Sequence, residues 1–586
     1  MTIDGNCSTF FARPQLTFRC MSQPDHAKLL AALQKNLHTK QVLLADRLPA
    51  SRDALRKLLA PLGLLAVREV ANAADVLRRV RNQRYDLIIT DFYLDQGRDA
   101  QQLLEEMRHN RSLPRSTAYL VVTGEGSYEN VLSLAELEPD AYLLRPFPPE
   151  ELQIRVLRAL YRKQHLQTIF NLIEQGKADE AIAACDALAA KEPELAHDAQ
   201  RQKGELLLQL GRNREAEAVF RHVLSIRSLP WARMGLARTQ RAQGHGEEAA
   251  ALASELLNDA PVFLAVNDFL AATLCDLGRL EAAQHVLQYA SERSPNNTRR
   301  QRQLGDLASR TGDLRCAETA YQAVIDRCRG SSQQQLDDFV NLARVQVAQG
   351  QPGSARTVLE EMRRVWRNDR QAEMAALIGE SLCLSAEGRT PLAVSLVRRA
   401  LQLRQTLEKQ QQHVLLTKNL SPRITVDLAR ACYATGHARE AEQLVQTVVR
   451  AHQEDTQVIS QVEQVLARSG RPDQGRHLLE QVDQAMVALN NRGIQAARSG
   501  NLRGAVELLM QAADEAPNLQ FLLNAAKAIY TLLDQEGWET SLAQRADDYL
   551  RRAEQKDPES PKVNAARLLR SAAARKHGID PRRRYV

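Results

Sequence analysis

Aromatic residues are scarce in this sequence, since Phe, Trp and Tyr together account for 4% of its 586 residues. Ala, Leu, Gln, Glu and Arg, which suit helices, take up the space instead. The chain is longer than one hydrophobic core usually organises, which predicts several domains or an extended repeat array. No apolar run approaches eighteen residues, and the first thirty residues lack a basic segment followed by an apolar one. We therefore expect neither a membrane span nor secretion.

Sequence signatures of metal and catalytic sites are also lacking. The eight cysteines form no CxxC pair and no histidine stands at zinc-finger spacing, which indicates reduced thiols and a cytoplasmic location. There is no GxxxxGK[ST], HExxH or GxSxG motif and no recognisable helix-turn-helix segment. We therefore expect neither an enzyme in the usual sense nor a DNA-binding regulator.

Positive charge is concentrated at one end of the chain. Of the net charge of +7, residues 567–586 carry +6, from seven Lys or Arg and one Asp. Such a segment can contact RNA, DNA or anionic lipid, or it can be a solvated terminus that keeps the last part of the fold soluble. We favour the solvated terminus and expect no nucleic-acid partner.

The segment between residues 41 and 164 alternates short apolar runs with amphipathic stretches. This pattern predicts a parallel sheet covered by helices on both faces. Four apolar runs are followed by the polar residues Asp46, Asp91, Thr123 and Arg145. Because function gathers at the carboxyl ends of parallel strands, these four residues are the candidate site.

Beyond about residue 166, helical patterns follow one another with a regular period. A Gly followed five residues later by an Ala recurs at intervals of 33 to 38 residues, and then of 48 and 64. The pairs are Gly176/Ala181, Gly211/Ala216, Gly244/Ala249, Gly278/Ala283, Gly312/Ala317, Gly350/Ala355, Gly388/Ala393, Gly436/Ala441 and Gly500/Ala505. We expect the Gly to end the first helix of a pair in a left-handed conformation, and the Ala to let the second helix approach closely.

This period resembles the tetratricopeptide repeat (TPR) over about two thirds of the chain. The resemblance implies a right-handed superhelix of helix pairs that binds a protein or peptide ligand. The motif does not identify that ligand. The interval of 48 predicts either a lengthened second helix or a loop between Arg404 and Pro422, and we favour the helix.

The strand-end residues resemble the receiver domain of two-component response regulators in their order and spacing. Asp91 follows Asp46 by 45 residues, Thr123 comes 32 residues later, and Arg145 another 22. By that resemblance Asp91 is the phosphoacceptor. The same resemblance implies that Mg²⁺ is held by Asp46, Asp91 and the backbone carbonyl of Tyr93.

Three further residues take roles at the phosphoryl group by the same resemblance. They are Thr123 and Arg145, which contact the phosphoryl group, and Tyr142, the aromatic switch beside it. Two positions depart from the family pattern, because Arg47 replaces an acid next to Asp46 and Arg145 replaces a lysine. We expect a weakened metal site.

These patterns together predict an α/β flavodoxin-like receiver with a five-stranded parallel sheet, followed by an all-α TPR solenoid. The expected segments are an N-terminal extension (1–38), the receiver (39–164), the repeats (165–560) and a basic tail (561–586), and Met21 is an alternative start. The predicted function is a signalling adaptor that a histidine kinase or phosphotransfer protein phosphorylates on Asp91. The alternative is a phosphorylation-independent pseudo-receiver on a TPR scaffold.

Overall fold

The computed structural model describes residues 29–33, 36–95, 98–124, 127–411, 421–452, 456–469, 472–556 and 560–579. They divide into two compact units. The first comprises Met1–Leu206, Ala216–Arg300 and Gly330–Gln333, and the second comprises Leu207–Glu215, Gln301–Arg329 and Gln334–Val586. Within the described part of the chain, no helix is both long and apolar enough to cross a membrane. None of the six described cysteines is in a disulfide.

A five-stranded parallel sheet lies at the core of the first unit. Its strands run in the order β2-β1-β3-β6-β7 and are β1 (Gln41–Ala45), β2 (Ala66–Val70), β3 (Leu87–Thr90), β6 (Ala118–Thr123) and β7 (Ala141–Leu144). The predicted fold class is confirmed. A short antiparallel pair, β4 (Tyr93–Asp95) and β5 (Arg98–Asp99), follows β3. The apolar alternation does not predict this pair, because its strands are too short to show a period.

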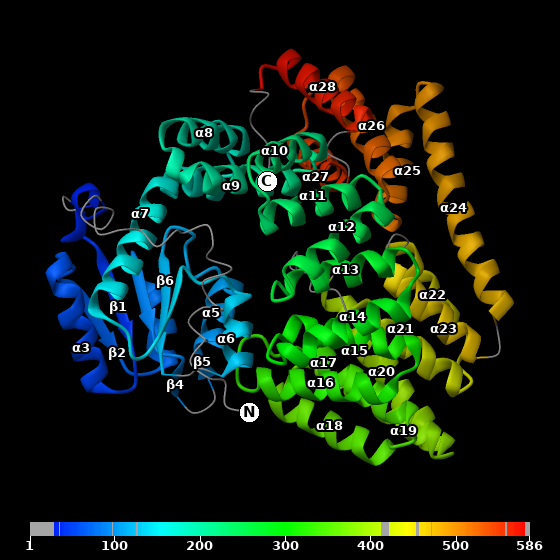
Figure 1. Cartoon of the computed structure of the whole chain (residues 1–586). Helices are drawn as coiled ribbons and strands as arrows, with labels where there is room; N and C mark the ends of the chain where they lie inside the picture. The colour runs from blue at the N-terminus through cyan, green and yellow to red at the C-terminus, as the bar shows by residue number, and fades with distance from the viewer. Residues whose placement is uncertain are drawn as a thin grey trace. The chain divides into compact units, whose positions relative to one another are not determined.

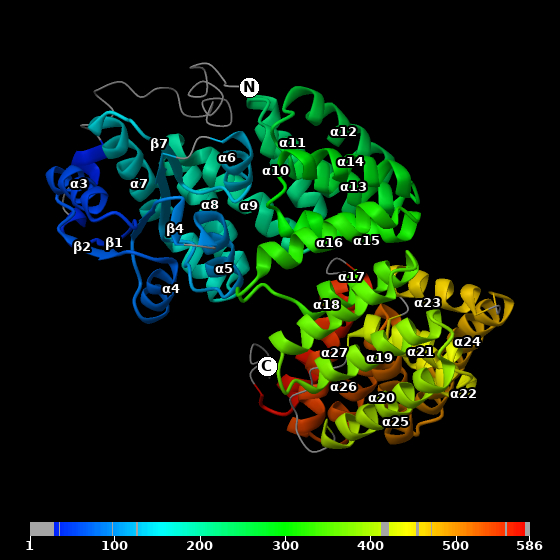
Figure 2. The same cartoon turned by 90° about the horizontal axis from the view of Figure 1, so that it is seen from below.

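Helices cover both faces of the sheet, as the sequence pattern predicts (Figure 1). One face carries α3 (Pro49–Leu59) and α7 (Pro149–Glu174), and the other carries α4 (Ala73–Asn82), α5 (Ala100–His109) and α6 (Tyr128–Ala135) (Figure 2). Three leucines that precede β1 also enter the core on the α3 side: Leu29, Leu33 and Leu37. Part of the expected N-terminal extension therefore packs against the sheet.

Helix α7 links the sheet to the repeats without a break. Its 26 residues begin at the sheet, where Leu152 and Val156 are buried, and continue to Glu174. Its second half packs Ile169 and Phe170 against α8 (Ala178–Lys191). The expected boundary between residues 164 and 165 thus lies inside one continuous helix.

The remaining helices form successive antiparallel pairs. Those that begin in the first unit are α9 (Ala196–Gln209), α11 (Pro230–Ala242), α12 (Gly246–Asp259), α13 (Ala265–Asp276), α14 (Leu280–Arg293) and α15 (Thr298–Thr311), and those that begin in the second are α10 (Asn213–Ile226), α16 (Leu314–Cys328), α17 (Leu336–Ala348), α18 (Pro352–Val365), α19 (Arg370–Ala386), α20 (Thr390–Gln411), α21 (Pro422–Ala434), α22 (Ala438–Ala451), α23 (Thr456–Arg468), α24 (Pro472–Arg498), α25 (Leu502–Glu515), α26 (Leu519–Glu536), α27 (Thr540–Lys556) and α28 (Pro561–Lys576).

The repeat pattern read from the sequence has the predicted physical basis. Each Gly of the nine pairs has a φ between +70° and +88°, the left-handed region that ends the first helix. Each Ala of the nine pairs is 0% exposed, at the contact between the two helices. The described part of the 48-residue interval is helical, because α20 runs for 22 residues to Gln411. Residues 412–420 of the interval lie outside the described residues.

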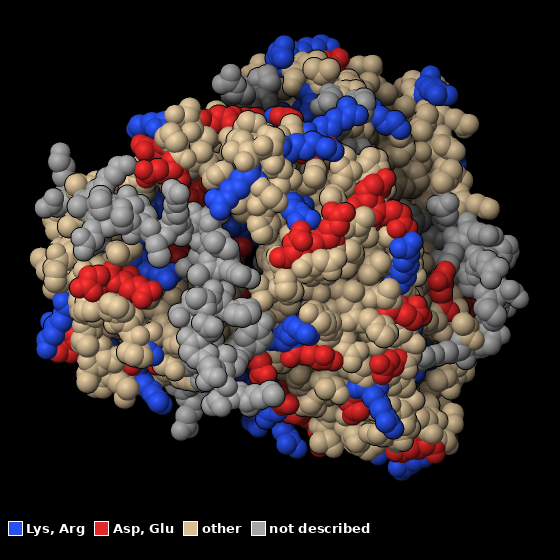
Figure 3. Space-filling model, viewed as in Figure 1, with Lys and Arg blue, Asp and Glu red and all other residues tan. Residues whose placement is uncertain are grey.

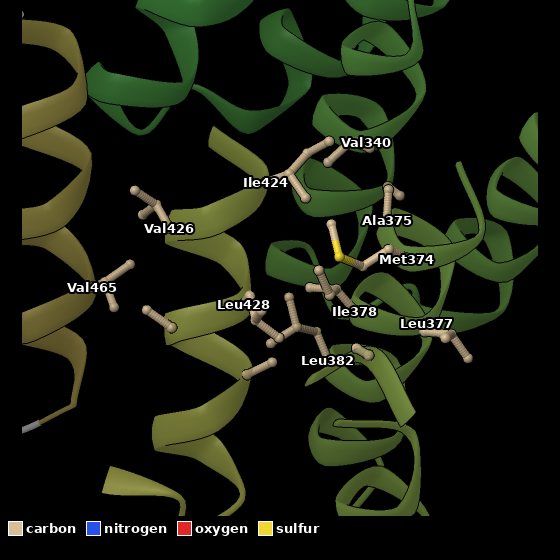
Figure 4. Packing of buried hydrophobic residues seen from close by; sticks show 14 of the residues in the cluster. Val340, Met374, Ala375, Leu377, Ile378, Leu382, Ile424, Val426, Leu428 and Val465 are labelled. Carbon is tan, nitrogen blue, oxygen red and sulfur yellow. The ribbon is translucent and has the colours of Figure 1, made fainter. Parts of the chain in front are cut away.

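The core of the second unit is built mainly from small and branched aliphatic residues. Figure 4 shows Ile378 and Leu382 of α19 facing Ile424 and Leu428 of α21, and all four side chains are buried. Figure 4 also shows Met374 filling the space beside them. This packing explains how a chain with few aromatic residues still buries a continuous core.

Residues 561–576 differ from the solvated tail that their charge predicts. They form α28, which buries Val563 and Ala566 against α26. The Arg570 side chain is also buried, and its guanidinium donates to Asp547 at 2.6 and 3.0 Å. Net charge does not predict this helix, because three of its basic residues pair with acids of α26 and α27: Arg567 with Glu554, Arg570 with Asp547 and Lys576 with Asp534.

Candidate functional site

Three of the candidate residues are fixed at one edge of the sheet by backbone hydrogen bonds. The amide of Asp46 donates to Val70 O at 3.2 Å, and the amide of Asp91 donates to Ala45 O at 2.8 Å. The amide of Arg145 donates to Thr123 O at 2.8 Å. The residues that follow β1, β3 and β7 therefore meet beside Thr123, the last residue of β6.

The Asp46 carboxylate is fully engaged by donors from the protein. Its Oδ1 accepts from the amide of Leu48 at 2.8 Å, and its Oδ2 accepts from Ser51 Oγ at 2.5 Å. Oδ2 also accepts from Arg145 Nη2 at 3.0 Å, and Arg145 Nη2 in turn donates to Ser51 Oγ at 2.7 Å. The side chain of Asp46 is 1% exposed.

Asp91 lies next to this cluster, and one of its carboxylate oxygens accepts no hydrogen bond from the described atoms. Its Oδ1 is 3.8 Å from Arg145 Nη1, and among the described atoms it has no hydrogen-bond partner. Burial raises the pKa of Asp91, and the nearby charge of Asp46 raises it further. The pKa is lowered by the charge of Arg145 and by hydrogen bonds from the amide of Phe92 and the hydroxyl of Thr123. Asp91 is thus a half-buried carboxylate with a cation on one side.

The other predicted site residues lie around Asp91 at different depths. Thr123 is 1% exposed, and Tyr142 is half-buried against the α5 side of the sheet. Tyr93 begins β4, and its hydroxyl accepts from Asn130 Nδ2 of α6 at 3.2 Å. Arg47, which the sequence places beside the metal position, is exposed. The cation that reaches both carboxylates is Arg145.

The donor set does not fit Mg²⁺ as it is arranged. Mg²⁺ requires near-octahedral oxygen ligands, but the guanidinium of Arg145 contacts Asp46 and faces Asp91. Arg47 stands at the position next to Asp46 where a second acid would balance the charge of Arg145. No group of three or more His, Cys, Asp and Glu that could hold a metal occurs in the described residues. The predicted Mg²⁺ site therefore holds a protein cation in this structure.

A second polar cluster joins α6 to the repeats within the first unit. Glu136 is the residue at the C-cap of α6. Its carboxylate accepts hydrogen bonds from three residues at the start of α15 and just before it. Arg300 donates at 2.5 and 3.3 Å, Ser294 Oγ at 2.8 Å and Asn297 Nδ2 at 3.1 Å. Arg300 is 0% exposed and also donates to Asp268 at 2.6 and 2.9 Å.

The same contact continues along α6. Ser133 Oγ lies 2.8 Å from Ser294 Oγ, and both residues are buried. Leu132 packs against Leu264 and Ala290 of the repeats. The α6 helix thus contacts the repeats through the apolar side chain of Leu132, through the hydrogen bonds of Ser133 and Asn130, and through the Glu136 carboxylate, which accepts four hydrogen bonds.

Sequence reasoning finds the strand-end residues but misses these partners. Ser51 stands in the first turn of α3, where a hydroxyl after a strand-end acid is a weak signal that could have been noticed. Glu136 and Arg300 are 164 residues apart, and no local pattern connects them.

Comparisons with known proteins match both parts of the chain. A response regulator receiver domain model matches residues 42–157, and two tetratricopeptide repeat models match residues 171–228 and 340–408, and residues 230–255 and 422–447. The transcriptional regulatory protein ResD of Bacillus subtilis is 27% identical over 106 residues, which is 18% of this chain and 42% of ResD. The chemotaxis protein CheY-3 of Vibrio cholerae is 25% identical over 117 residues, which is 20% of this chain and 86% of CheY-3.

Comparison with solved structures also finds tetratricopeptide repeat proteins. A tetratricopeptide repeat protein from Parabacteroides merdae covers 52% of this chain and 98% of its own, with 11% identity and a TM-score of 0.31. The C-terminal part of a TPR protein from Cytophaga hutchinsonii covers 45% of this chain and 99% of its own, with the same identity and TM-score. The assignment of the repeats rests on the repeat models and on the geometry described above.

Proposed function

Because the chain joins a response regulator receiver domain to tetratricopeptide repeats, we propose that it is a signalling adaptor controlled by phosphorylation of Asp91. The observation that carries this proposal is the oxygen of Asp91 that has no hydrogen-bond partner among the described atoms, 3.8 Å from the Arg145 guanidinium. A carboxylate oxygen next to a fixed cation suits nucleophilic attack on a phosphoryl group.

The proposed transfer balances with groups of this chain and one phosphodonor. The phosphodonor is a phosphohistidine of a histidine kinase or phosphotransfer protein. An oxygen of Asp91 forms the new P–O bond, the P–N bond to the donor imidazole breaks, and the imidazole nitrogen takes a proton from solvent. Arg145 offsets charge on the phosphoryl oxygens, and the hydroxyl of Thr123 donates a hydrogen bond to one of them. Arg145 supplies here the charge that a divalent cation would supply.

The readout is proposed to run through α6. This helix lies in the chain between Thr123 and Tyr142, the two residues predicted to respond to the phosphoryl group, and it contacts the repeats through Glu136. When Thr123 and Arg145 turn toward a phosphoryl group, α6 shifts and its contact with the repeats weakens. The repeats then bind a protein or peptide ligand, which makes the chain an adaptor rather than an enzyme.

Nucleic acid is not part of this proposal. On the face that Figure 3 shows, basic and acidic side chains are interspersed over the surface. A nucleic-acid interface requires basic side chains clustered on one face. The pairing of Arg570 with Asp547 further reduces the charge available from the basic C-terminal segment.

A second candidate function is a pseudo-receiver that holds the repeats without phosphorylation. The observation in its favour is the Asp46–Arg145 pair, because Arg145 already neutralises the acid that would bind a metal. In that case Asp91 is a structural carboxylate and α6 is a permanent anchor.

Phosphoryl transfer to the full-length chain separates the two candidates. The wild type, Asp91→Asn and Arg145→Ala are each incubated with a radiolabelled small phosphodonor, with Mg²⁺ or with a chelator. The proposal predicts label on the wild type in chelator, none on Asp91→Asn, and strongly reduced label on Arg145→Ala in chelator. No label on the wild type under any metal condition would identify a pseudo-receiver.

A further inference from the structure

The repeats contain a site for a carboxylate that the receiver itself fills. We infer that Ser294, Asn297 and Arg300, here called the carboxylate site, recognise a short helix with Leu and Glu four residues apart. In this structure that helix is α6, through Leu132 and Glu136, and a partner protein that presents such a helix competes for the same site. The inference deepens the proposed function, because it defines the chemistry of the ligand that the repeats bind.

The geometry of the carboxylate site is complete on the repeat side. Arg300 is oriented by Asp268, which accepts from its Nε and Nη2 at 2.6 and 2.9 Å. The backbone amide of Arg300 donates to Asn297 Oδ1 at 3.1 Å. This hydrogen bond orients the Asn297 side chain, whose Nδ2 donates to Glu136. These contacts lie within the repeats and do not depend on α6. The site is therefore preorganised for a carboxylate.

The charge balance favours an acidic ligand. Asp268 experiences the positive charges of both Arg299 and Arg300 and the negative charge of Glu136. When Glu136 leaves, two arginines remain against one aspartate, and the buried guanidinium of Arg300 loses one of its two partners. A buried cation with a vacated hydrogen-bonding face is costly, so another carboxylate is strongly preferred there.

The position of Glu136 does not serve α6 itself. A carboxylate at the C-terminus of a helix lies at the negative end of the helix dipole, which is unfavourable for the helix. Four residues earlier, one turn back on the same face, Leu132 enters an apolar contact with Leu264 and Ala290. The helix therefore presents an apolar anchor and an acid in register with the repeats.

A synthetic peptide with the sequence of residues 127–139 tests this inference on the full-length chain. Its binding is measured by fluorescence anisotropy to the wild type, to Glu136→Ala, which vacates the site, and to Glu138→Gln. The last variant is a matched control, because Glu138 pairs with Arg201 at 2.8 Å next to the carboxylate site but outside it. We expect Glu136→Ala to bind the peptide roughly tenfold more tightly than the wild type or Glu138→Gln, since α6 competes at a high effective concentration in both.

A change in the peptide keeps the test independent of protein folding. The peptide that carries Glu136→Gln is expected to bind the Glu136→Ala chain roughly tenfold more weakly than the unmodified peptide does. When Ser294→Ala and Asn297→Ala are added to that chain, the unmodified peptide is also expected to bind more weakly. Equal binding of the Glu and Gln peptides, or no binding to the Glu136→Ala chain, would overturn the inference. Label on Asp91 without peptide binding would refute this inference alone, and peptide binding without label would refute phosphorylation alone.

Discussion

The guanidinium of Arg145 lies 3.0 Å from Asp46 and 3.8 Å from Asp91, so that one side chain faces both acids of the receiver. In Asp46 this contact adds to hydrogen bonds from Leu48 and Ser51. Among the described residues, Arg145 is the cation within 4.0 Å of the Asp91 carboxylate. Arg145 is therefore the cation that both carboxylates of the candidate site face.

Replacement of Arg145 by alanine is expected to create Mg²⁺ affinity. The substitution removes the cation and leaves two acids at the sheet edge, so Mg²⁺ affinity should rise by roughly tenfold, or about 1.4 kcal/mol. Isothermal titration calorimetry on the full-length chain measures the change. Arg47→Ala is the control, because Arg47 is exposed and its removal should alter the affinity less. A wild type that binds Mg²⁺ as tightly as Arg145→Ala would contradict the assigned role of Arg145.

Asp91→Asn is expected to stabilise the chain at neutral pH, because the substitution removes a charge that burial disfavours. Burial raises the pKa of Asp91 in the folded state above its ordinary value of 3.8. The folded chain therefore binds this proton more tightly than the unfolded chain, and stability is lost as the pH rises through the folded pKa.

The gain from Asp91→Asn should consequently shrink as the pH is lowered toward the ordinary range of an aspartate. Thermal unfolding of both chains at neutral and at mildly acidic pH measures this trend. A substitution that destabilises the chain at neutral pH would show that the charge of Asp91 is needed for its pairing with Arg145.

The carboxyl edge of the sheet could be predicted from the sequence, and its charge arrangement could not. Asp46, Asp91 and Arg145 each follow an apolar run, and the order of those runs dictates that they meet. Which cation enters the site depends on where each side chain reaches in the folded chain. Arg47 is next to Asp46 in the sequence but is exposed to solvent, whereas Arg145, 99 residues away, makes the contact. Similarly, the repeats follow from their period, whereas the Glu136–Arg300 pair needs the folded chain.

Gly235→Ala is expected to destabilise the first unit by about 1–3 kcal/mol. A Cβ at Gly235 would lie 2.4 Å from the ring of Phe220, and a Cβ at Gly204 would lie 2.6 Å from the same ring. The loss is measured as a fall in the thermal midpoint. Gly353→Ala is the control, because a Cβ there meets nothing within 4 Å, and it should be neutral or slightly stabilising. Equal effects of the two substitutions would refute close packing as the reason for Gly235.

Asp547→Ala is expected to detach α28 at a cost of about 3–5 kcal/mol. The substitution leaves the buried guanidinium of Arg570 without this carboxylate and also removes the acceptor of the Tyr530 hydroxyl, at 2.8 Å. Limited proteolysis should then cleave near the start of α28 faster than in the wild type. Asp548→Ala, at a half-exposed neighbour that pairs with Arg551 and Arg552, should leave the rate unchanged.

Hydrogen exchange of the full-length chain tests most directly the claim that the receiver controls the repeats. The wild type and Asp91→Asn are compared by mass spectrometry with and without a small phosphodonor, and the extent of labelling is measured in the same samples. The account predicts that label on Asp91 accelerates exchange in α6 and in residues 294–300 of the wild type, while Asp91→Asn shows no change. Full labelling of Asp91 with unchanged exchange in both segments would contradict it.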